Sequence, residues 1–486
     1  SYTITYFRRR PQSDCAIHMM NEFIHLNLYA NQESTSVINA DGVVIDTFSR
    51  RIKCTTSDGP LLKAFADAFD RTMPLAGIVD ELAEYGADQL QNFYSVLKRV
   101  YQDAALSIEY HDGDVIGGRF VPMSAMPLIV DVAGYSGRIQ LARFAAFHKM
   151  GTTLVLEAPI ANARFELYDR NTISTITSWM AASSSRVENS LLARLLILTG
   201  LAVVVDESAA SAQNELNEPD GWTSHEMFFQ FRSRHGFHTN PSGGLFYGAG
   251  RRDPLPANRP RLDCDIRIPL PAPTHITSDS LESVVSRRVS TRKFSQQQPS
   301  LAQLGELFWR TMRQTEALSM TVKDQSGIDH VFPLKRRPVP SGGAVHEIDA
   351  YILANVGGEL PAGLWRYDDE YHEMVHVADL GEDSQIVSYH AQRSAALSET
   401  PYMLVLFSAR FDRMMWKYTA MPFAAILKHV GVLYEIFYLV ATDMGLGVCG
   451  LGNGESRAFS RMIGTHPAVE TTVGEMLIGI PMHSSS

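Results

Sequence analysis

The chain has 486 residues, more than a single hydrophobic core normally accommodates, so we expect about three domains. With 45% hydrophobic and 20% charged residues, its composition is typical of a folded globular protein and excludes a largely disordered chain. A formal net charge of −10 argues against a nucleic-acid partner held by bulk electrostatics.

Four cysteines, Cys15, Cys54, Cys264 and Cys449, are scattered along the chain without a close pair. This spacing excludes a short zinc or redox motif and is typical of a protein in a reducing compartment. The longest apolar run, near 430–441, contains Glu435 and is too short to span a bilayer. We therefore expect a cytoplasmic protein with no membrane partner and no metal site.

The first half of the chain is interpreted as two similar winged-helix-like modules, 1–130 and 131–212. In the first module we expect a strand at Val43–Phe48, helices at 61–69, 75–83 and 89–101, and a hairpin of Leu106–Tyr110 with Val115–Val121. In the second we expect strands at Thr152–Leu156 and Arg164–Tyr168, helices at Thr172–Met180 and Glu188–Leu198, and a strand at Leu201–Val205.

Three roles remain open for these modules. Winged helices often read DNA, but the candidate recognition helices offer only Arg194 in one module and Lys98 with Arg99 in the other. A second role is to bind an extended peptide along an exposed strand edge. The third is to scaffold the C-terminal domain or a dimer.

The segment 213–277 has no long periodic run and is rich in Pro, Gly, Asn and Asp. It also carries aromatic residues that a free linker would not need, including Trp222, Phe237 and Phe246. We expect this segment to pack along the C-terminal domain, with a hinge at Arg261–Pro273.

Residues 278–486 predict an α+β domain with a mixed sheet, surrounding helices and a long buried helix. Helix starts are indicated at Asp279 with Glu282 and at Ser300 with Gln303. Strands are expected at Ala350–Ala354, Gly363–Tyr367, Glu373–Val377, Tyr402–Ser408 and Met476–Ile480, and an almost wholly apolar helix at Phe423–Met444.

Between the first two of these helices lies a basic stretch, Ser286–Phe294, with four cations and two hydroxyls. Arg288, Ser290 and Arg292 alternate, so on an extended backbone they project in the same direction and can converge on one phosphate. Taken by itself, the stretch is better explained as a solvated basic turn.

The sequence Gly445-Leu-Gly-Val-Cys-Gly450 matches the dinucleotide-binding pattern, which requires a preceding strand and a following helix. Here it follows a helix instead. We therefore interpret Gly445 as a helix C-cap and the later glycines as a close approach to a flat ligand. Val339 stands where a nucleophile elbow around Ser341 needs glycine, which excludes a serine hydrolase of that type.

Three motifs in this order resemble the nitroreductase fold of FMN enzymes: Arg288-x-Ser290-x-Arg292, Pro340-Ser-Gly-Gly343 before a strand, and Gly445-Leu-Gly447 after a long helix. Lys417-Tyr418, placed at the start of the long helix, and the segment 229–236 are similar to SagB-type or McbC-like dehydrogenases, which oxidise azolines in ribosomal peptides. The two N-terminal modules further resemble the layout of cyanobactin thiazoline oxidases.

The resemblance implies FMN as cofactor and a homodimer. It implies that Arg288, Ser290 and Arg292 hold the FMN phosphate and ribityl chain, and that Pro340, Ser341 and Gly342 touch the flavin from the second subunit. The backbone at Cys449, Gly450 and Leu451 would hydrogen-bond flavin N5. Val289 and His346-Glu347 depart from the usual pattern, and the second departure leaves the substrate side undefined.

The implied reaction converts a thiazoline, or an oxazoline, in a modified peptide to the aromatic ring, with molecular oxygen reoxidising the cofactor. Tyr418 is a candidate base if the Lys417 ammonium lowers its pKa, and Lys417 itself is another if burial keeps it neutral. An NAD(P)H-dependent nitro- or quinone reductase of the same fold is an alternative. So is a winged-helix binding protein with an inactive flavin domain.

Overall fold

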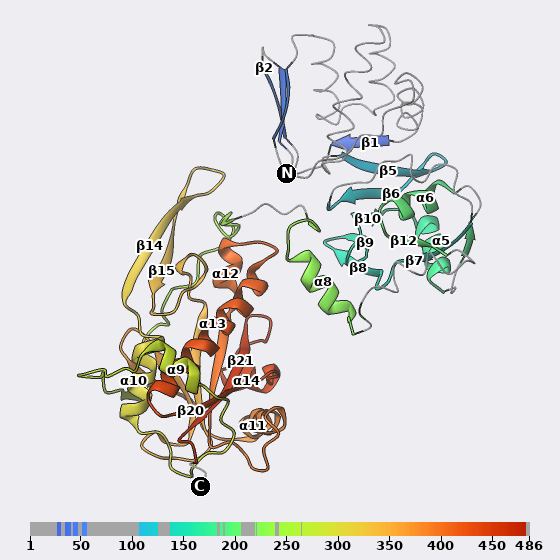
Figure 1. Ribbon diagram of the computed structural model, residues 1–486. Helices are drawn as coiled ribbons and strands as arrows, with labels where there is room; N and C mark the ends of the chain where they lie inside the picture. Colours follow the sequence, from blue (N-terminus) through green and yellow to red (C-terminus); the bar gives the residue numbers. More distant parts are fainter. Residues whose placement is uncertain are drawn as a thin grey trace. The chain divides into compact units, whose positions relative to one another are not determined.

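The computed structural model describes residues 27–30, 35–39, 42–46, 51–55, 106–124, 137–181, 185–187, 190–205, 219, 221–238, 243–263 and 265–482 (Figure 1). The chain divides into two units, Ser1–Pro241 and Ser242–Ser486. The helices expected at 61–69, 75–83 and 89–101 lie outside the described residues, as do Cys15 and Cys264.

The main feature of the first unit is a six-stranded antiparallel sheet with the order β1-β5-β6-β10-β9-β8. Its strands are β1 (Asn27–Ala30), β5 (Leu106–Asp112), β6 (Val115–Pro122), β8 (Ala146–Met150), β9 (Thr153–Glu157) and β10 (Ala163–Leu167). Apolar side chains fill its core, where the rings of Phe120 and Phe165 stack with centroids 4.0 Å apart. The expected hairpin and the first two expected strands of the second module, at 152–156 and 164–168, are confirmed.

Smaller elements complete this unit. They are the sheet β2 (Thr35–Asn39), β3 (Gly42–Asp46) and β4 (Arg51–Thr55), the sheet β7 (Gly137–Leu141), β11 (Ser185–Val187) and β12 (Ala202–Val205), and helices α5 (Arg170–Ala181), α6 (Leu191–Leu198) and α8 (Ser224–Arg232). Strands β6 and β10 pair over Pro122↔Ala163 to Gly118↔Leu167. Strands on both sides of the boundary predicted near residue 130 therefore join one sheet.

The second unit is built on a seven-stranded sheet with the order β13-β18-β17-β16-β19-β21-β20. Its strands are β13 (Arg267–Pro269), β16 (Ile348–Ala354), β17 (Gly363–Asp368), β18 (Glu373–Ala378), β19 (Met403–Arg410), β20 (Gly447–Gly450) and β21 (Glu470–Gly479). All ladders in this sheet are antiparallel, which corrects the expectation of a mixed sheet. Pairing direction depends on contacts distant in sequence, which local patterns do not record.

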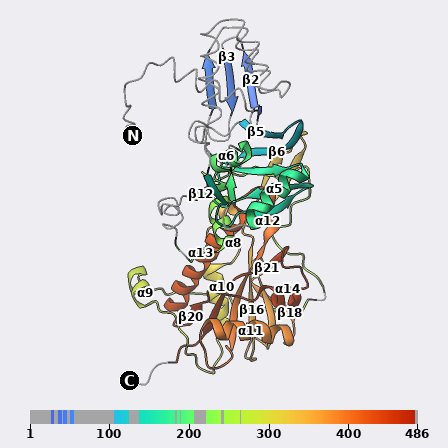
Figure 2. The same cartoon turned by 90° about the vertical axis from the view of Figure 1, so that its right-hand side faces the viewer.

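Helices cover both faces of this sheet (Figure 2). On one face lie α10 (Leu301–Thr311) and α13 (Pro422–Asp443), and on the other α11 (Glu382–Ser394) and α14 (Ser456–Met462). Side chains of the central strands alternate between the two cores: Val405 and Phe407 face α13, whereas Leu404 and Leu406 face the opposite core. The expected strands, and the long helix at 423–444, are confirmed.

Helix α13 is buried only on one side. Pro422, Ala425, Ile426, Val430, Leu433, Phe437, Val440 and Ala441 are buried. On the other side Phe423, Leu427 and Val432 are 36–41% exposed, and the exposed Lys428 and Glu435 share this face. Among the described residues α13 is the one helix long and apolar enough to cross a membrane, a test that core helices of soluble proteins also pass.

Five further elements complete the described part of the unit: α9 (Leu281–Arg287), the hairpin β14 (Glu316–Lys323) with β15 (Asp329–Arg336), the 3₁₀ helix η2 (Gly342–Ala344) and the short helix α12 (Phe411–Lys417). The hairpin, α11, α12 and α14 were not among the elements expected from the sequence. The stretch predicted as a hinge contains β13, which pairs with β18 and so belongs to the sheet.

The irregular segment 243–263 packs along α12. The Phe246 and Gly248 N–H groups donate to the carbonyls of Lys417 and Trp416 at 2.9 Å. The buried Arg413 donates to the Leu255 carbonyl at 2.8 Å. Residues 221–238 belong to the first unit instead, and Ser224–Arg232 among them form α8. The segment therefore contains a helix that no periodic run predicted.

Candidate functional site

The basic turn lies against the edge strand β20. Ser290 forms a parallel bridge with Val448, and the Thr291 N–H donates to the Val448 carbonyl at 2.9 Å. A Cβ at Gly447 would lie 2.7 Å from Thr291 Cγ2. Gly447 thus allows the basic turn to approach the strand closely.

The cations of the turn differ in what they contact. Arg287 pairs with Asp279 on the surface. For Arg288 and the exposed Arg292, no carboxylate lies within ion-pair distance in the part of the chain that the structure describes. The Ser290 hydroxyl is exposed as well. Two arginines without acidic partners and one hydroxyl on a short turn are a donor set that fits a phosphate dianion.

Tyr438 of α13 joins this turn to the glycine strand. Its hydroxyl lies 2.9 Å from Ser290 Oγ and accepts a hydrogen bond from the Gly450 N–H at 2.8 Å. The Arg288 guanidinium lies over its ring, 5.2 Å from the centroid. The structure therefore brings together Arg288, Ser290 and Gly450, and it does so through a residue that sequence reasoning missed. The available signal was a tyrosine hydroxyl on a largely apolar helix.

Cys449, Gly450 and Leu451 occupy the end of β20 and the residue after it. The Cys449 side chain is 1% exposed and belongs to the core on the α11 and α14 side, so it is a packing residue. The Leu451 N–H donates to the Glu475 carbonyl at 2.8 Å. The amides of Gly450 and Leu451, which the resemblance assigns to a ligand, thus have partners within the chain.

A second group of predicted residues surrounds the turn at 340–344. Ser341 Oγ donates to Glu347 Oε2 at 3.3 Å, and the Gly342 N–H donates to His429 Nε2 at 2.8 Å. Burial lowers the pKa of the neighbouring His346 to about 2, so that imidazole is neutral. Pro340 is exposed and directly precedes the turn.

Lys417 and Tyr418 lie beside this same turn. Lys417 is the last residue of α12 and Tyr418 is its C-cap, so neither begins the long helix, which starts at Pro422. Lys417 is 6% exposed, and its Nζ donates to the Gly343 carbonyl at 3.3 Å. The rings of Phe246 and Tyr418 lie 5.5 and 5.3 Å from Nζ.

The pKa shifts of Lys417 and Tyr418 contradict one expectation. Burial raises the pKa of Tyr418, and the nearby Glu347 carboxylate raises it further. Burial lowers the pKa of Lys417. The idea that the Lys417 ammonium lowers the phenol pKa is therefore wrong, because desolvation disfavours the phenolate. The geometry favours Lys417 as the group that can be a neutral base.

The predicted residues therefore form two groups along α13. His429 anchors the group of Ser341, Gly342, Lys417 and Tyr418, and Tyr438 anchors the group of Arg288, Ser290 and Gly450. The two anchors are nine positions apart on the helix, a rise of about 13 Å. Within one chain, then, the two groups lie at different points along one helix.

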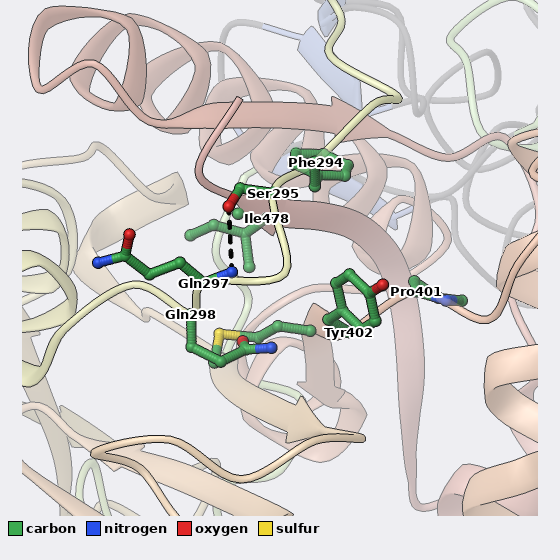
Figure 3. Close-up of a pocket in the computed structure, with 9 residues that line it drawn as sticks. Phe294, Ser295, Gln297, Gln298, Pro401, Tyr402 and Ile478 are labelled. Carbon is green, nitrogen blue, oxygen red and sulfur yellow. Dashed lines mark hydrogen bonds between the residues drawn. The ribbon is translucent and has the colours of Figure 1, made fainter. Parts of the chain in front are cut away.

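Hollows in the second unit differ in size. Figure 3 shows a pocket of about 10 Å³ lined by residues such as Phe294, Gln298 and Tyr402, with room for about one water molecule. None of its lining residues is a predicted site residue. An open hollow of about 350 Å³ beside Leu451 reaches the buried Glu475, whose carboxyl pKa is raised by burial. This hollow adjoins the glycine strand, whereas a third hollow of about 570 Å³, beside Asp383 and Arg461, is lined by no predicted site residue.

Comparison with protein-family models gives two matches in this chain. Residues 285–480 match the nitroreductase family, and residues 139–239 match the cyanobactin oxidase ThcOx. The first covers the basic turn, the 340–344 turn, Lys417 and the glycine strand. The expectation of a nitroreductase-like domain at the C-terminus is thereby confirmed, whereas the winged-helix assignment of the first unit stays a prediction.

Three individual proteins that are similar to this chain share less than a quarter of its residues over the aligned regions. A curated protein of Methanocaldococcus jannaschii named as a nitroreductase, MJ1384, is 24% identical over 172 residues, which are 35% of this chain and 78% of that protein. A crystal structure of a nitroreductase-named protein from Ralstonia eutropha is 23% identical, covers 47% of this chain and 95% of its own, and has a TM-score of 0.35. The Escherichia coli microcin synthetase McbBCD complex with truncated pro-MccB17 bound is 17% identical, with coverages of 50% and 89% and a TM-score of 0.32.

Proposed function

We propose that this chain, which carries a nitroreductase family domain at residues 285–480, is an FMN-dependent oxidase that converts thiazolines in a ribosomally made, modified peptide to thiazoles. One observation carries the proposal: Lys417 is buried beside Tyr418 and the 340–344 turn, with no carboxylate within ion-pair distance in the described part of the chain. The match of residues 139–239 to a cyanobactin oxidase supports a peptide azoline as substrate.

The donor set of the basic turn fits the proposed cofactor. Arg288, Ser290 and Arg292 would hold the FMN phosphate and ribityl chain, because these side chains are accessible and the two arginines have no competing acidic partner among the described residues. The backbone at 449–451 would face the flavin ring. Bound FMN would supply the hydride acceptor that the reaction requires.

A homodimer would bring the two groups of site residues together. Leu427 and Val432 of α13 are partly exposed, and the exposed Gly431 between them offers space for a second helix to approach. If two copies of α13 pair antiparallel about a two-fold axis near Leu433, the His429 end of one lies near the Tyr438 end of the other. Pro340, Ser341 and Gly342 would then reach the flavin held by the partner subunit.

Lys417 would take the proton from the thiazoline ring carbon. A neutral amine is needed for this step, and burial shifts Lys417 toward that form. Tyr418 would orient the ring beside it, with its own proton retained because its pKa is raised. Molecular oxygen is the proposed final electron acceptor.

The first unit would hold the peptide. Its six-stranded sheet ends in two edge strands, β1 and β8, and an extended peptide can add to such an edge. The chain would thus combine a peptide-holding unit with an oxidising one.

An anaerobic mixing experiment tests the choice between an azoline oxidase and a nicotinamide-dependent reductase. FMN-loaded protein is mixed with a thiazoline peptide, and separately with NADPH, while flavin absorbance is followed. We expect the peptide to bleach the flavin and NADPH to leave it oxidised. Bleaching by NADPH alone would identify the reductase instead.

A further inference from the structure

The turn that follows Ser341 adopts a backbone conformation that is rarely populated. Gly343, Ala344 and His346 all have positive φ angles, of 61°, 57° and 46°. Glycine tolerates this region, but alanine and histidine seldom adopt it. A turn of this kind persists only where its surroundings determine it.

The buried side chain of Glu347 and the partly buried side chain of His429 hold this turn. Glu347 Oε1 lies 2.6 Å from Nδ1 of His429, and His429 Nε2 accepts the hydrogen bond from the Gly342 N–H. Because a backbone N–H can only donate, the ring proton must be on Nδ1, facing the carboxylate. The second carboxylate oxygen accepts from Ser341 Oγ. Ser341 and Gly342, the first two residues of the turn, are thereby held by Glu347 and His429 respectively.

The next residue of the same turn contacts the proposed base. The Gly343 carbonyl accepts from Lys417 Nζ at 3.3 Å. A Cβ at Gly343 would collide with the lysine amine, so the lysine packs directly on the bare backbone. The place of the amine therefore depends on where the turn lies.

We propose that Glu347 and His429 are positioning residues for Lys417. They set the 341–343 turn, and the turn sets the lysine amine through the Gly343 carbonyl. This inference rests on the proposed function, in which Lys417 takes the substrate proton. A base displaced by about 1 Å can lose about 10²-fold in rate, so the pair would control kcat without touching the substrate.

Two variants of one residue test the role. His429→Leu removes the acceptor for the Gly342 N–H, whereas His429→Gln retains a side-chain oxygen that can accept it. His390→Leu, at an exposed position on α11, is the matched control. For FMN-loaded protein and a thiazoline peptide, we expect His429→Leu to lower kcat about 10²-fold with KM changed less than about threefold. His429→Gln should recover most of kcat, and the control should match the wild type.

A second readout does not depend on turnover. The rate at which an amine-directed reagent labels Lys417 is measured against pH by peptide mass spectrometry. We expect His429→Leu and Glu347→Ala to move the labelling midpoint toward that of an ordinary lysine, because the freed amine gains water. Glu347→Gln, which can still accept from Nδ1, should keep the wild-type profile.

The outcomes separate this inference from the proposed function. If no thiazoline is oxidised but the labelling midpoint moves as described, the positioning role stands and the proposed function fails. An unchanged midpoint in both His429→Leu and Glu347→Ala would overturn the positioning role. So would equal loss of kcat in His429→Leu and His429→Gln, since that pattern indicates packing alone. If His429→Leu does not fold, Glu347→Ala against Glu347→Gln decides in the same way.

Discussion

The Tyr438 hydroxyl lies 2.9 Å from Ser290 Oγ, and this contact joins the basic turn to the long helix α13. The same oxygen accepts the Gly450 N–H at 2.8 Å, so one side chain links the turn to the glycine strand. A phenol can accept one hydrogen bond and donate another, which allows both contacts at once. Tyr438 thus couples the proposed phosphate-binding groups to the proposed flavin-ring backbone.

Removal of this hydroxyl should weaken cofactor binding moderately. We predict that Tyr438→Phe raises the FMN dissociation constant about fivefold, as expected for one net hydrogen bond of about 1 kcal/mol. The ring beneath Arg288 is kept, so the effect reports the hydroxyl. Quenching of flavin fluorescence measures the binding. Tyr389→Phe, at a half-exposed tyrosine of α11, should change nothing, and equal constants for Tyr438→Phe and wild type would contradict the coupling.

The arginines of the basic turn should differ in importance. We predict that Arg288→Ala and Arg292→Ala each weaken FMN binding about 10- to 100-fold, because each would lose charge-assisted hydrogen bonds to phosphate. Arg287 has the same charge but is paired with Asp279 at the surface. Arg287→Ala should therefore alter binding less than about twofold. If all three variants lose affinity equally in a fluorescence titration, the turn acts through net charge and not as a clamp.

Lys417 and Tyr418 should respond differently to substitution and to pH. Lys417→Met should lower the rate of thiazoline oxidation about 10²- to 10⁴-fold with FMN retained, whereas Tyr418→Phe should keep a large part of it. Because the base must be neutral, the wild-type rate should fall as pH falls through the Lys417 pKa. Burial lowers that pKa, so the fall should occur below the pH expected for an ordinary lysine. An inactive Tyr418→Phe variant together with an active Lys417→Met variant would indicate that Tyr418 is the base and Lys417 is not.

The exposed face of α13 that carries Leu427 should be the contact between subunits. We predict that Leu427→Glu halves the molecular mass seen by light scattering and lowers FMN occupancy, since a carboxylate in an apolar interface is strongly unfavourable. Tyr389→Glu, on the opposite face of the sheet, serves as the control. A wild-type chain that is already a monomer would contradict the proposed dimer.

Local patterns in the sequence identified the elements whose periodicity is strong. The capping box at Ser300 and Gln303 and the long helix at 423–444 are found in the structure. Gly445, with φ of 72°, ends that helix directly after its C-cap Met444. The basic turn does lie between two helices. These features depend on neighbouring residues, and one sequence contains that information.

Features that depend on distant contacts were not predictable in the same way. The hairpin β14–β15 is an exception, because Leu318, Met320 and Val322 alternate with polar residues along β14 and the sequence therefore did carry a local signal for this strand. Helix α12 has only seven residues, too few for a period, and Lys417 was therefore assigned to the start of α13. The roles of Tyr438 and His429 arise from contacts more than eighty positions away in the chain, with Ser290 and Gly342.

The central claim is tested most directly by incubating the FMN-loaded chain with a thiazoline-containing peptide under air. Mass spectrometry of the peptide and a peroxide assay are read together. We predict a loss of about 2 Da for each ring, with one equivalent of peroxide. An unchanged peptide mass, in protein shown to contain FMN, would contradict the assignment as a thiazoline oxidase.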